Sequence, residues 1–116
     1  MKRDLDLMRD LLFEAEDGKL PFVHFVLVLN PSEDEVKRCG HADLLCDVGF
    51  FEKINKDAYR MTSSGYDYLE TIRDENIWKR TKTKISLIGG STLKIASDIA
   101  LTIFTEAAKE KLGMNL

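Results

Sequence analysis

The sequence predicts an α+β fold that is mostly helical: a winged-helix-like core (helix, strand, helix, β-hairpin wing, helix) followed by a C-terminal helical hairpin. Apolar residues in segment 4–17 recur at three- and four-residue intervals, as in an amphipathic helix. Two short runs, "GFFEKI" and "AYRMT", flank a polar turn at 55–57, as in a hairpin. Gly89-Gly90 breaks a later helical region in two. We expect residues 1–76 to form the core and residues 77–116 an extension packed on the core or on a partner subunit.

The first two elements follow from hydrophobic spacing. A helix is expected over residues 4–17, ending at Gly18, with Leu11 at the edge of its apolar stripe. The stripe itself contains Leu5, Met8, Leu12 and Ala15. Residues 22–29, "FVHFVLVL", are β-branched and aromatic on both faces, which predicts a strand covered on both sides. We expect His24 to be a packed core histidine, because no second metal ligand lies nearby.

The next helix begins with a capping signal. Ser32 is followed three residues later by Glu35, the pattern of a capping box, and the helix should run to about Asp47 and stop at Gly49. Only 17 residues lie between Pro31 and Gly49. A winged helix normally places a positioning helix and a recognition helix in this region. The capping signals predict one helix, so the positioning helix is either missing or fused to the recognition helix.

Three further helices are expected after the hairpin. Thr62, Ser63 or Ser64 caps a helix that reaches about Asp74. Its inner stripe contains Gly65, Leu69 and Ile72. Trp78 opens or anchors a basic helical stretch to Ile88, and Ser91 or Thr92 caps a last helix to about Leu112.

Several motifs in this chain occur together in a known family. The run "YRMTSSGYDYLETIRDENIWKRTKTKISLIGGS", with the opening "MKRDLDLMR" and the block "HADLLCDVGFF", resembles small bacterial and prophage proteins of domain-of-unknown-function family 2513. The matching positions are Tyr59 to Thr62, Gly65, Leu69, Ile72 to Asp74, Trp78, Lys82 and Gly89 to Ser91. The resemblance implies a winged-helix-like fold and residence in bacteria, phage or prophage. It implies no particular activity and no catalytic residues.

The charge distribution argues against DNA binding through the expected core. Residues 1–75 contain 17 acidic and 10 basic residues, whereas residues 76–97 contain five basic residues and no acidic one. The helix in the recognition position has a net charge of −3. Its charged residues are Glu33, Asp34, Glu35, Asp43 and Asp47 against Lys37 and Arg38. Such a helix would bring like charges toward phosphates.

A basic segment at 79–84 is the better nucleic-acid candidate. On a helix its four cations form two adjoining rows that cover one broad side. The candidate contacts with nucleic acid or an acidic partner are Lys79, Arg80, Lys82 and Lys84, with Lys56 and Arg60 from the wing. The alternative is a solvated face that complements the acidic core of the same chain or of a partner subunit. Trp78 could stack on a base, but its apolar neighbours favour an anchoring role.

The residue pattern contains no catalytic, cofactor-binding or metal-binding set. Cys39 and Cys46 are spaced i, i+7, as expected of core thiols in a reduced cytoplasmic protein. His41 lies on the same expected helix, but its spacing to either cysteine turns the side chains apart. "LIGGST" lacks the spacing and the lysine of a phosphate-binding loop, so it is expected to be an interhelical turn. The chain is therefore not expected to be an enzyme.

The last helix is apolar over much of its circumference. The candidate oligomer interface contains Leu93, Ala96, Ala100, Ile103, Phe104 and Ala107. A helix of this kind is buried on more than one side, so we expect a homodimer. The function expected is a small regulatory or accessory protein that binds another, unidentified protein in a bacterial or host cytoplasm. The alternative is a winged-helix DNA-binding regulator that uses the wing and the basic segment; no membrane segment is expected.

Overall fold

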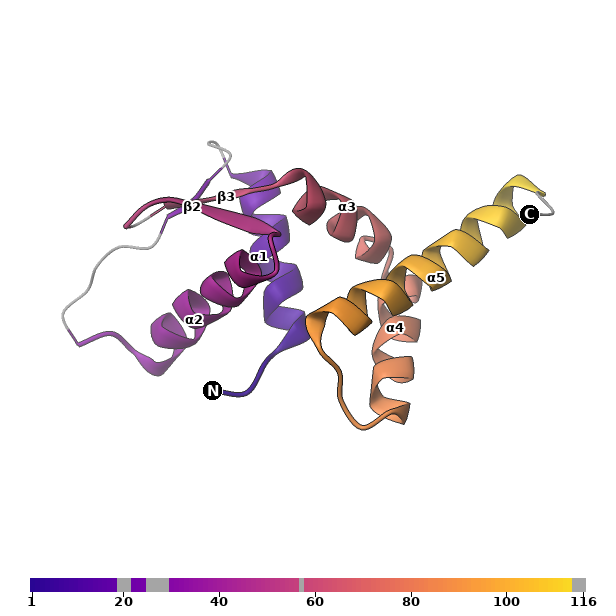
Figure 1. Cartoon of the computed structure of the whole chain (residues 1–116), viewed down its shortest axis with the longest axis horizontal. Coiled ribbons are helices and arrows are strands. Elements are labelled where there is room, and N and C mark those ends of the chain that lie inside the picture. Colours follow the sequence, from indigo (N-terminus) through magenta and orange to yellow (C-terminus); the bar gives the residue numbers. More distant parts are fainter. Residues whose placement is uncertain (19–21, 25–29, 57, 114–116) are drawn as a thin grey trace. The chain divides into compact units, whose positions relative to one another are not determined.

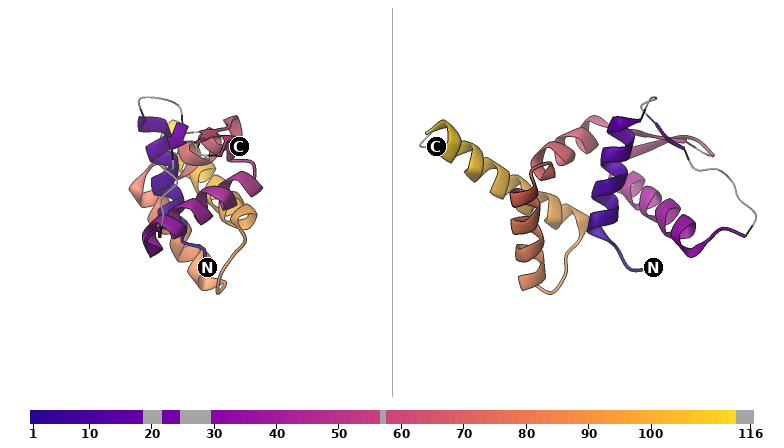
Figure 2. Two further views of the ribbon diagram at one scale, coloured as in Figure 1. Left: turned by 90° about the vertical axis from the view of Figure 1, so that its left-hand side faces the viewer. Right: turned by 180° about the vertical axis from the view of Figure 1, so that it is seen from behind.

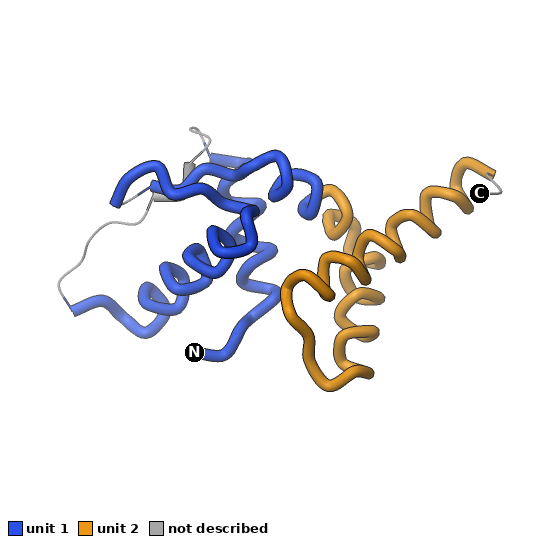
Figure 3. The backbone as a smooth tube through the Cα atoms, viewed as in Figure 1, with its two compact units in different colours: residues 1–69 blue, residues 70–116 orange. Residues whose placement is uncertain are grey.

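The computed structural model describes residues 1–18, 22–24, 30–56 and 58–113 (Figure 1). The chain divides into two compact units, residues 1–69 and 70–116 (Figure 3). This division falls within a helix, a few residues before the boundary that we expected at residue 76. In the described part of the chain, none of the helices combines the length and the apolar character that crossing a membrane requires.

The first helix, α1 (Leu5–Asp17), confirms the expected segment. The side chain of Asp4 caps it by accepting a hydrogen bond of 3.0 Å from the backbone N–H of Leu7. Met8, Leu11, Leu12 and Ala15 are all buried. Leu11 is therefore a core residue, and its expected place at the edge of the stripe is wrong. The reason is that α1 packs against α2 and also against strands β1 and β3, which requires a wider apolar face than one stripe.

The sheet has three antiparallel strands in the order β1-β3-β2. β2 (Phe51–Asn55) and β3 (Ala58–Met61) form the expected hairpin, and β1 (Phe22–His24) pairs with the other edge of β3. Phe51, Tyr59 and Met61 are buried, so one face of the hairpin contributes to the core of the first unit. Three parts of the prediction lie outside what the structure describes: residues 25–29 of the expected strand, the side chain of His24 and the turn residue Asp57.

The helix α2 (Glu33–Asp47) is a single helix, as expected. Ser32 Oγ accepts a hydrogen bond of 3.2 Å from the backbone N–H of Glu35, which is one half of the capping box. The chain leaves the helix through Gly49, whose φ of 82° is accessible mainly to glycine. α2 packs against α1, and Figure 2 shows this pair from behind.

The helix α3 (Ser63–Ile72) is capped by Thr62, whose Oγ1 accepts a hydrogen bond of 3.1 Å from the backbone N–H of Gly65. The expected inner stripe, Gly65, Leu69 and Ile72, is buried. The helix ends two residues before the expected Asp74. Asp74 instead caps the next helix, because its Oδ1 accepts from the backbone N–H groups of Asn76 and Ile77.

The second unit contains the expected helical hairpin, α4 (Glu75–Leu87) and α5 (Leu93–Leu112), whose helices pack against each other. Gly89 and Gly90 form the break, both with positive φ, and Thr92 Oγ1 caps α5 at 3.2 Å from the N–H of Ile95. Trp78 is 2% exposed and anchors α4 in the core of this unit. The other buried residues of the pair are Ile77, Thr81, Ile85, Leu93, Ala96, Ala100 and Ile103.

Candidate functional site

The cations of α2 are turned toward α1. Lys37 Nζ lies 2.9 Å from Asp4 Oδ2, and one terminal nitrogen of Arg38 lies 2.8 Å and 2.9 Å from the two carboxylate oxygens of Glu14. Exposed ion pairs of this kind contribute little to stability, typically below about 1 kcal/mol each. Their main effect here is on side-chain orientation, because they hold the Lys37 and Arg38 side chains at the contact between α1 and α2.

The outward face of α2 is therefore acidic. Glu33, Asp34, Glu35 and Asp47 are exposed. The first three lie in the first turn, where the positive end of the helix dipole favours negative charge. We call these four residues the acidic face. The charges of this helix are only partly divided in space, because Asp34 lines the same hollow beside α1 as Lys37 and Arg38.

Asp4 joins the two helices through both its side chain and its backbone. The hydrogen bond from the Lys37 ammonium and that from the Leu7 N–H hold the pKa of the Asp4 carboxyl below its usual value. The Asp4 backbone N–H donates to His41 Nε2 at 2.8 Å. The start of α1 is fixed to α2 by these contacts.

His41 is fully buried and has backbone partners on both ring nitrogens. Its Nδ1 lies 2.7 Å from the carbonyl oxygen of Lys37, which can only accept. The proton therefore belongs to Nδ1, and Nε2 accepts from Asp4. His41 is therefore a structural residue that joins α1 to α2. Both of its ring nitrogens are bonded to backbone groups and not to the two cysteines of the same helix.

Tyr59 and Asp43 form a second polar contact beside α2. Tyr59 Oη donates to Asp43 Oδ1 at 2.5 Å. Burial, and then this hydrogen bond, raise the pKa of Tyr59 well above its usual value. Burial also raises the pKa of the Cys39 and Cys46 thiols, and the nearby Asp43 carboxylate adds to both shifts. Both cysteines are half-buried free thiols, and the raised pKa values favour the unreactive protonated form.

The two wing residues proposed as contacts have different surroundings. Arg60 pairs with Glu52 of the neighbouring strand at 2.5 Å, so its charge is largely compensated. Lys56 lies exposed at the tip of the hairpin. Lys53, which we did not propose, has its ammonium 5.5 Å from the centre of the Tyr59 ring. The wing therefore offers a small basic surface at most.

The four cations of α4 lie on two sides of the helix. Lys79 and Lys82 border one shallow hollow, together with Leu87, whereas Arg80 and Lys84 border a different one. The Lys82 ammonium lies 5.6 Å from the centre of the Trp78 ring. Trp78 is too deeply buried to stack on a base, which leaves the anchoring role. The two expected rows exist, but they face different surroundings.

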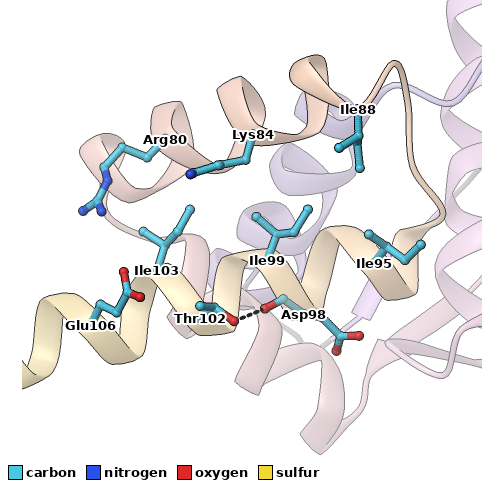
Figure 4. Close-up of a pocket in the computed structure, with 9 residues that line it drawn as sticks. All are labelled: Arg80, Lys84, Ile88, Ile95, Asp98, Ile99, Thr102, Ile103 and Glu106. Atoms are coloured by element: carbon cyan, nitrogen blue, oxygen red, sulfur yellow. Dashed lines mark hydrogen bonds between the residues drawn. The ribbon is translucent and has the colours of Figure 1, made fainter.

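Arg80 and Lys84 form the basic wall of a groove between α4 and α5 (Figure 4). The groove has a volume of about 440 Å³. Its apolar floor consists of Ile88, Ile95, Ile99 and Ile103. The opposite wall belongs to α5 and carries the exposed carboxylates of Asp98 and Glu106. We refer to this feature as the α4–α5 groove.

The residues proposed for an oligomer interface are mostly covered within the single chain. Leu93, Ala96, Ala100 and Ile103 are buried, Ala107 is half-buried and Phe104 is 36% exposed. The exposed apolar residues nearby are instead Leu87, Ile88, Ile95 and Leu101. The sequence contained a signal for the groove, since Ile95, Ile99 and Ile103 recur at intervals of four. Of this row, only Ile103 belongs to the interface that was predicted from the sequence.

The motif residues that suggested a family have structural tasks. Thr62 caps α3, Asp74 caps α4, and Gly89 and Gly90 form the turn before α5. Position 65 requires glycine because the Phe50 backbone lies close to it: an added Cβ atom would lie 2.2 Å from the Phe50 carbonyl oxygen. These motif residues therefore have identifiable roles in the fold. Among the residues described, no group of histidine, cysteine and acidic side chains is arranged to hold a metal ion.

Comparison with known proteins agrees with these structural observations. The profile of a family described as hypothetical protein (DUF2513) matches residues 2–91. The match ends at the residue before the cap of α5, so it covers α1 to α4 and the turn that follows. No curated protein and no solved structure matches the chain.

Proposed function

The chain belongs to the DUF2513 family, and from that premise we propose that it is a non-enzymatic accessory or regulatory protein of bacterial or phage type that acts in the cytoplasm by binding another protein. The contact surface is the acidic face of α2, on a scaffold whose order of elements resembles a winged helix. The partner presents a basic surface, such as the DNA-binding surface of another protein.

The observation that supports this function is the position of the α2 cations. Lys37 and Arg38 are engaged by Asp4 and Glu14, which offsets their charge, so the exposed charged surface of the helix is predominantly acidic although both cations remain partly exposed. Such a surface attracts a basic protein and repels phosphates, and the effect is strongest at low ionic strength. In a DNA-reading winged helix the same position needs cations or neutral hydrogen-bonding side chains.

A DNA-binding regulator is the second candidate. The specific observation that favours it is the exposure of Lys79, Arg80, Lys84 and Lys56. Two observations weigh against it: Arg60 is paired with Glu52, and Trp78 is buried. The basic segment also lies on a different unit from the wing, so a continuous footprint requires a defined arrangement of the two units on DNA.

The two candidates are separated by binding titrations with defined probes. We expect a fluorescein-labelled peptide rich in lysine and arginine to bind the protein at about 20 mM salt, and a labelled random duplex of about 20 base pairs to show no binding. The variant Asp34→Asn/Glu35→Gln/Asp47→Asn should weaken peptide binding about ten-fold, because each removed charge contributes about 0.5 kcal/mol. Glu33 is retained to support the helix start.

The matched control removes the same charge elsewhere in the first unit. Asp10→Asn/Asp17→Asn/Asp67→Asn neutralises three exposed carboxylates on α1 and α3. It should change peptide affinity by less than two-fold. Equal weakening by both variants would show that net charge alone matters and would refute the acidic face as the site. Duplex binding that is lost on reversing Lys79, Arg80, Lys82 and Lys84 to Glu would establish the second candidate instead.

A further inference from the structure

The α4–α5 groove exposes apolar surface that a single chain does not cover. Ile88 is 58% exposed and Ile95 is 45% exposed, although both line the floor of the groove. Ile99 and Ile103 continue the floor along α5 at four-residue intervals (Figure 4). Ile99 is half-buried and Ile103 is buried, so the exposed apolar surface is concentrated at the Ile88 and Ile95 end of the groove. Contiguous apolar surface rimmed by charge is typical of an interaction site.

The two walls of the groove carry opposite charges. The basic wall, Arg80 and Lys84, belongs entirely to α4, and the acidic wall, Asp98 and Glu106, belongs entirely to α5. Asp98 also lies 3.8 Å from Lys94 of the same helix, in an exposed pair that is weak enough to exchange. Arg80 lies near the Glu106 end of the groove, whereas Ile88 lies near the Ile95 end (Figure 4). An occupant must therefore present acidic groups to α4 and basic groups to α5, on either side of an apolar strip.

A second copy of the same helix pair meets this requirement. Consider a two-fold axis that runs along the groove, above its floor. Rotation about this axis places α4 of each copy over α5 of the other. The position of each residue along the axis does not change. Arg80 then faces Glu106 of the second copy, and Lys84 faces the neighbourhood of its Asp98. The isoleucine floors face each other at the centre.

We propose that the α4–α5 groove is the dimer interface of this protein, occupied by the same groove of a second copy, with Arg80 and Lys84 paired with Glu106 and Asp98 across the two-fold axis. The proposal concerns α4 and α5 and does not depend on the acidic face of α2. Ile103 is common to this interface and to the one predicted from sequence, whereas Ile88, Ile95 and Ile99 take the place of the buried leucine and alanines of α5.

The test uses two full-length variants with complementary charges. Arg80→Glu/Lys84→Glu has two acidic walls, and Asp98→Lys/Glu106→Lys has two basic walls. Wild-type protein should sediment as a dimer at about 20 µM. Each variant alone should be monomeric, because its walls repel those of an identical copy. An equimolar mixture should form a heterodimer, because every wall then faces one of opposite charge.

Control variants and folding measurements keep the result interpretable. Circular dichroism melts should show that both charge variants are folded, and recovery of the dimer on mixing is itself proof of competent chains. Leu101→Glu places a charge on an exposed apolar position of α5 that does not line the groove, and it should remain dimeric. Wild type that is monomeric at 100 µM, charge variants that dimerise alone, or a mixture that remains monomeric would each overturn the proposal.

Discussion

The buried imidazole of His41 accepts a hydrogen bond of 2.8 Å from the backbone N–H of Asp4, the residue that caps α1. The bond joins the first turn of α1 to the middle of α2, and the neighbouring Lys37–Asp4 ion pair closes the same contact from the solvent side. The start of α1 thus depends on a residue 37 positions later in the chain.

Replacement of His41 should therefore be costly. In His41→Leu, the Asp4 N–H and the Lys37 carbonyl lose their buried partner, and we expect a loss of about 2–3 kcal/mol in the free energy of unfolding. His41→Gln retains an amide oxygen that can accept, so it should lose less. Urea unfolding followed by circular dichroism measures both. Equal stability of His41→Leu and wild type would contradict the structural role.

The Asp4 carboxylate should make stability depend on pH. Its pKa is lowered in the folded state relative to the reference value of 3.8, so its contribution is fully present above that value and is lost as pH falls through the folded pKa. In Asp4→Asn this contribution is absent. We expect wild type to exceed the variant by no more than about 1 kcal/mol at pH 7, since the pair is partly solvated. The difference should shrink between pH 4 and pH 2, and a constant difference would argue against the pairing.

Gly65 should not tolerate a side chain. An added Cβ atom would lie 2.2 Å from the Phe50 carbonyl oxygen and 2.7 Å from Met61 Cγ. The Phe50 carbonyl also accepts from the Thr62 N–H, so it cannot move without loosening the start of α3. We expect Gly65→Ala to lose about 2–3 kcal/mol, as overpacked core positions do.

Gly40 offers the matched control in another helix. A Cβ atom at this position would meet only the Met1 Sδ and Cε atoms, which belong to the end of a flexible side chain. Gly40→Ala should therefore be neutral, or stabilising by up to about 1 kcal/mol, because alanine favours helix more than glycine does. Thermal unfolding of the two variants should separate them clearly. Similar losses of stability in both variants would show that alanine is tolerated no better at position 40 than at position 65.

The two buried tyrosines should remain protonated as long as the protein is folded. Burial raises the pKa of Tyr68, and burial with the bond to Asp43 raises that of Tyr59. The variant Tyr66→Phe removes the third tyrosine, so any phenolate signal must come from Tyr59 or Tyr68. Absorbance at 295 nm should show no phenolate until alkaline unfolding begins. A phenolate signal before the far-ultraviolet circular dichroism changes would contradict their burial.

The parts of the fold that were predictable from sequence depend on local hydrogen bonds. Ser32 and Thr92 cap helices within three residues of themselves, and Gly89 and Gly90 break the chain where they stand. The absence of a second capping signal between Pro31 and Gly49 likewise predicted one helix. In each case the physical cause lies in a few consecutive residues, and the sequence displays it directly.

The parts that were not predictable depend on partners far along the chain. The pairing of Arg38 with Glu14 leaves no local trace, since either cation of α2 could equally have faced solvent. The full burial of Leu11 depends on α1 meeting both a helix and a sheet. The division of the α4 cations between two surroundings depends on how α5 packs. Composition gave the net charge of each helix, but only packing decides which charges remain available to a partner.

The turn at Gly89 and Gly90 has a consequence for protein engineering. With φ values of 78° and 128°, the backbone of the turn itself sets the direction in which α5 departs. The side chains of α5 need to satisfy only the arc that packs on α4. The exposed positions of α5 outside the α4–α5 groove, such as Leu101, are therefore open to redesign without altering the residues that fold the helix pair.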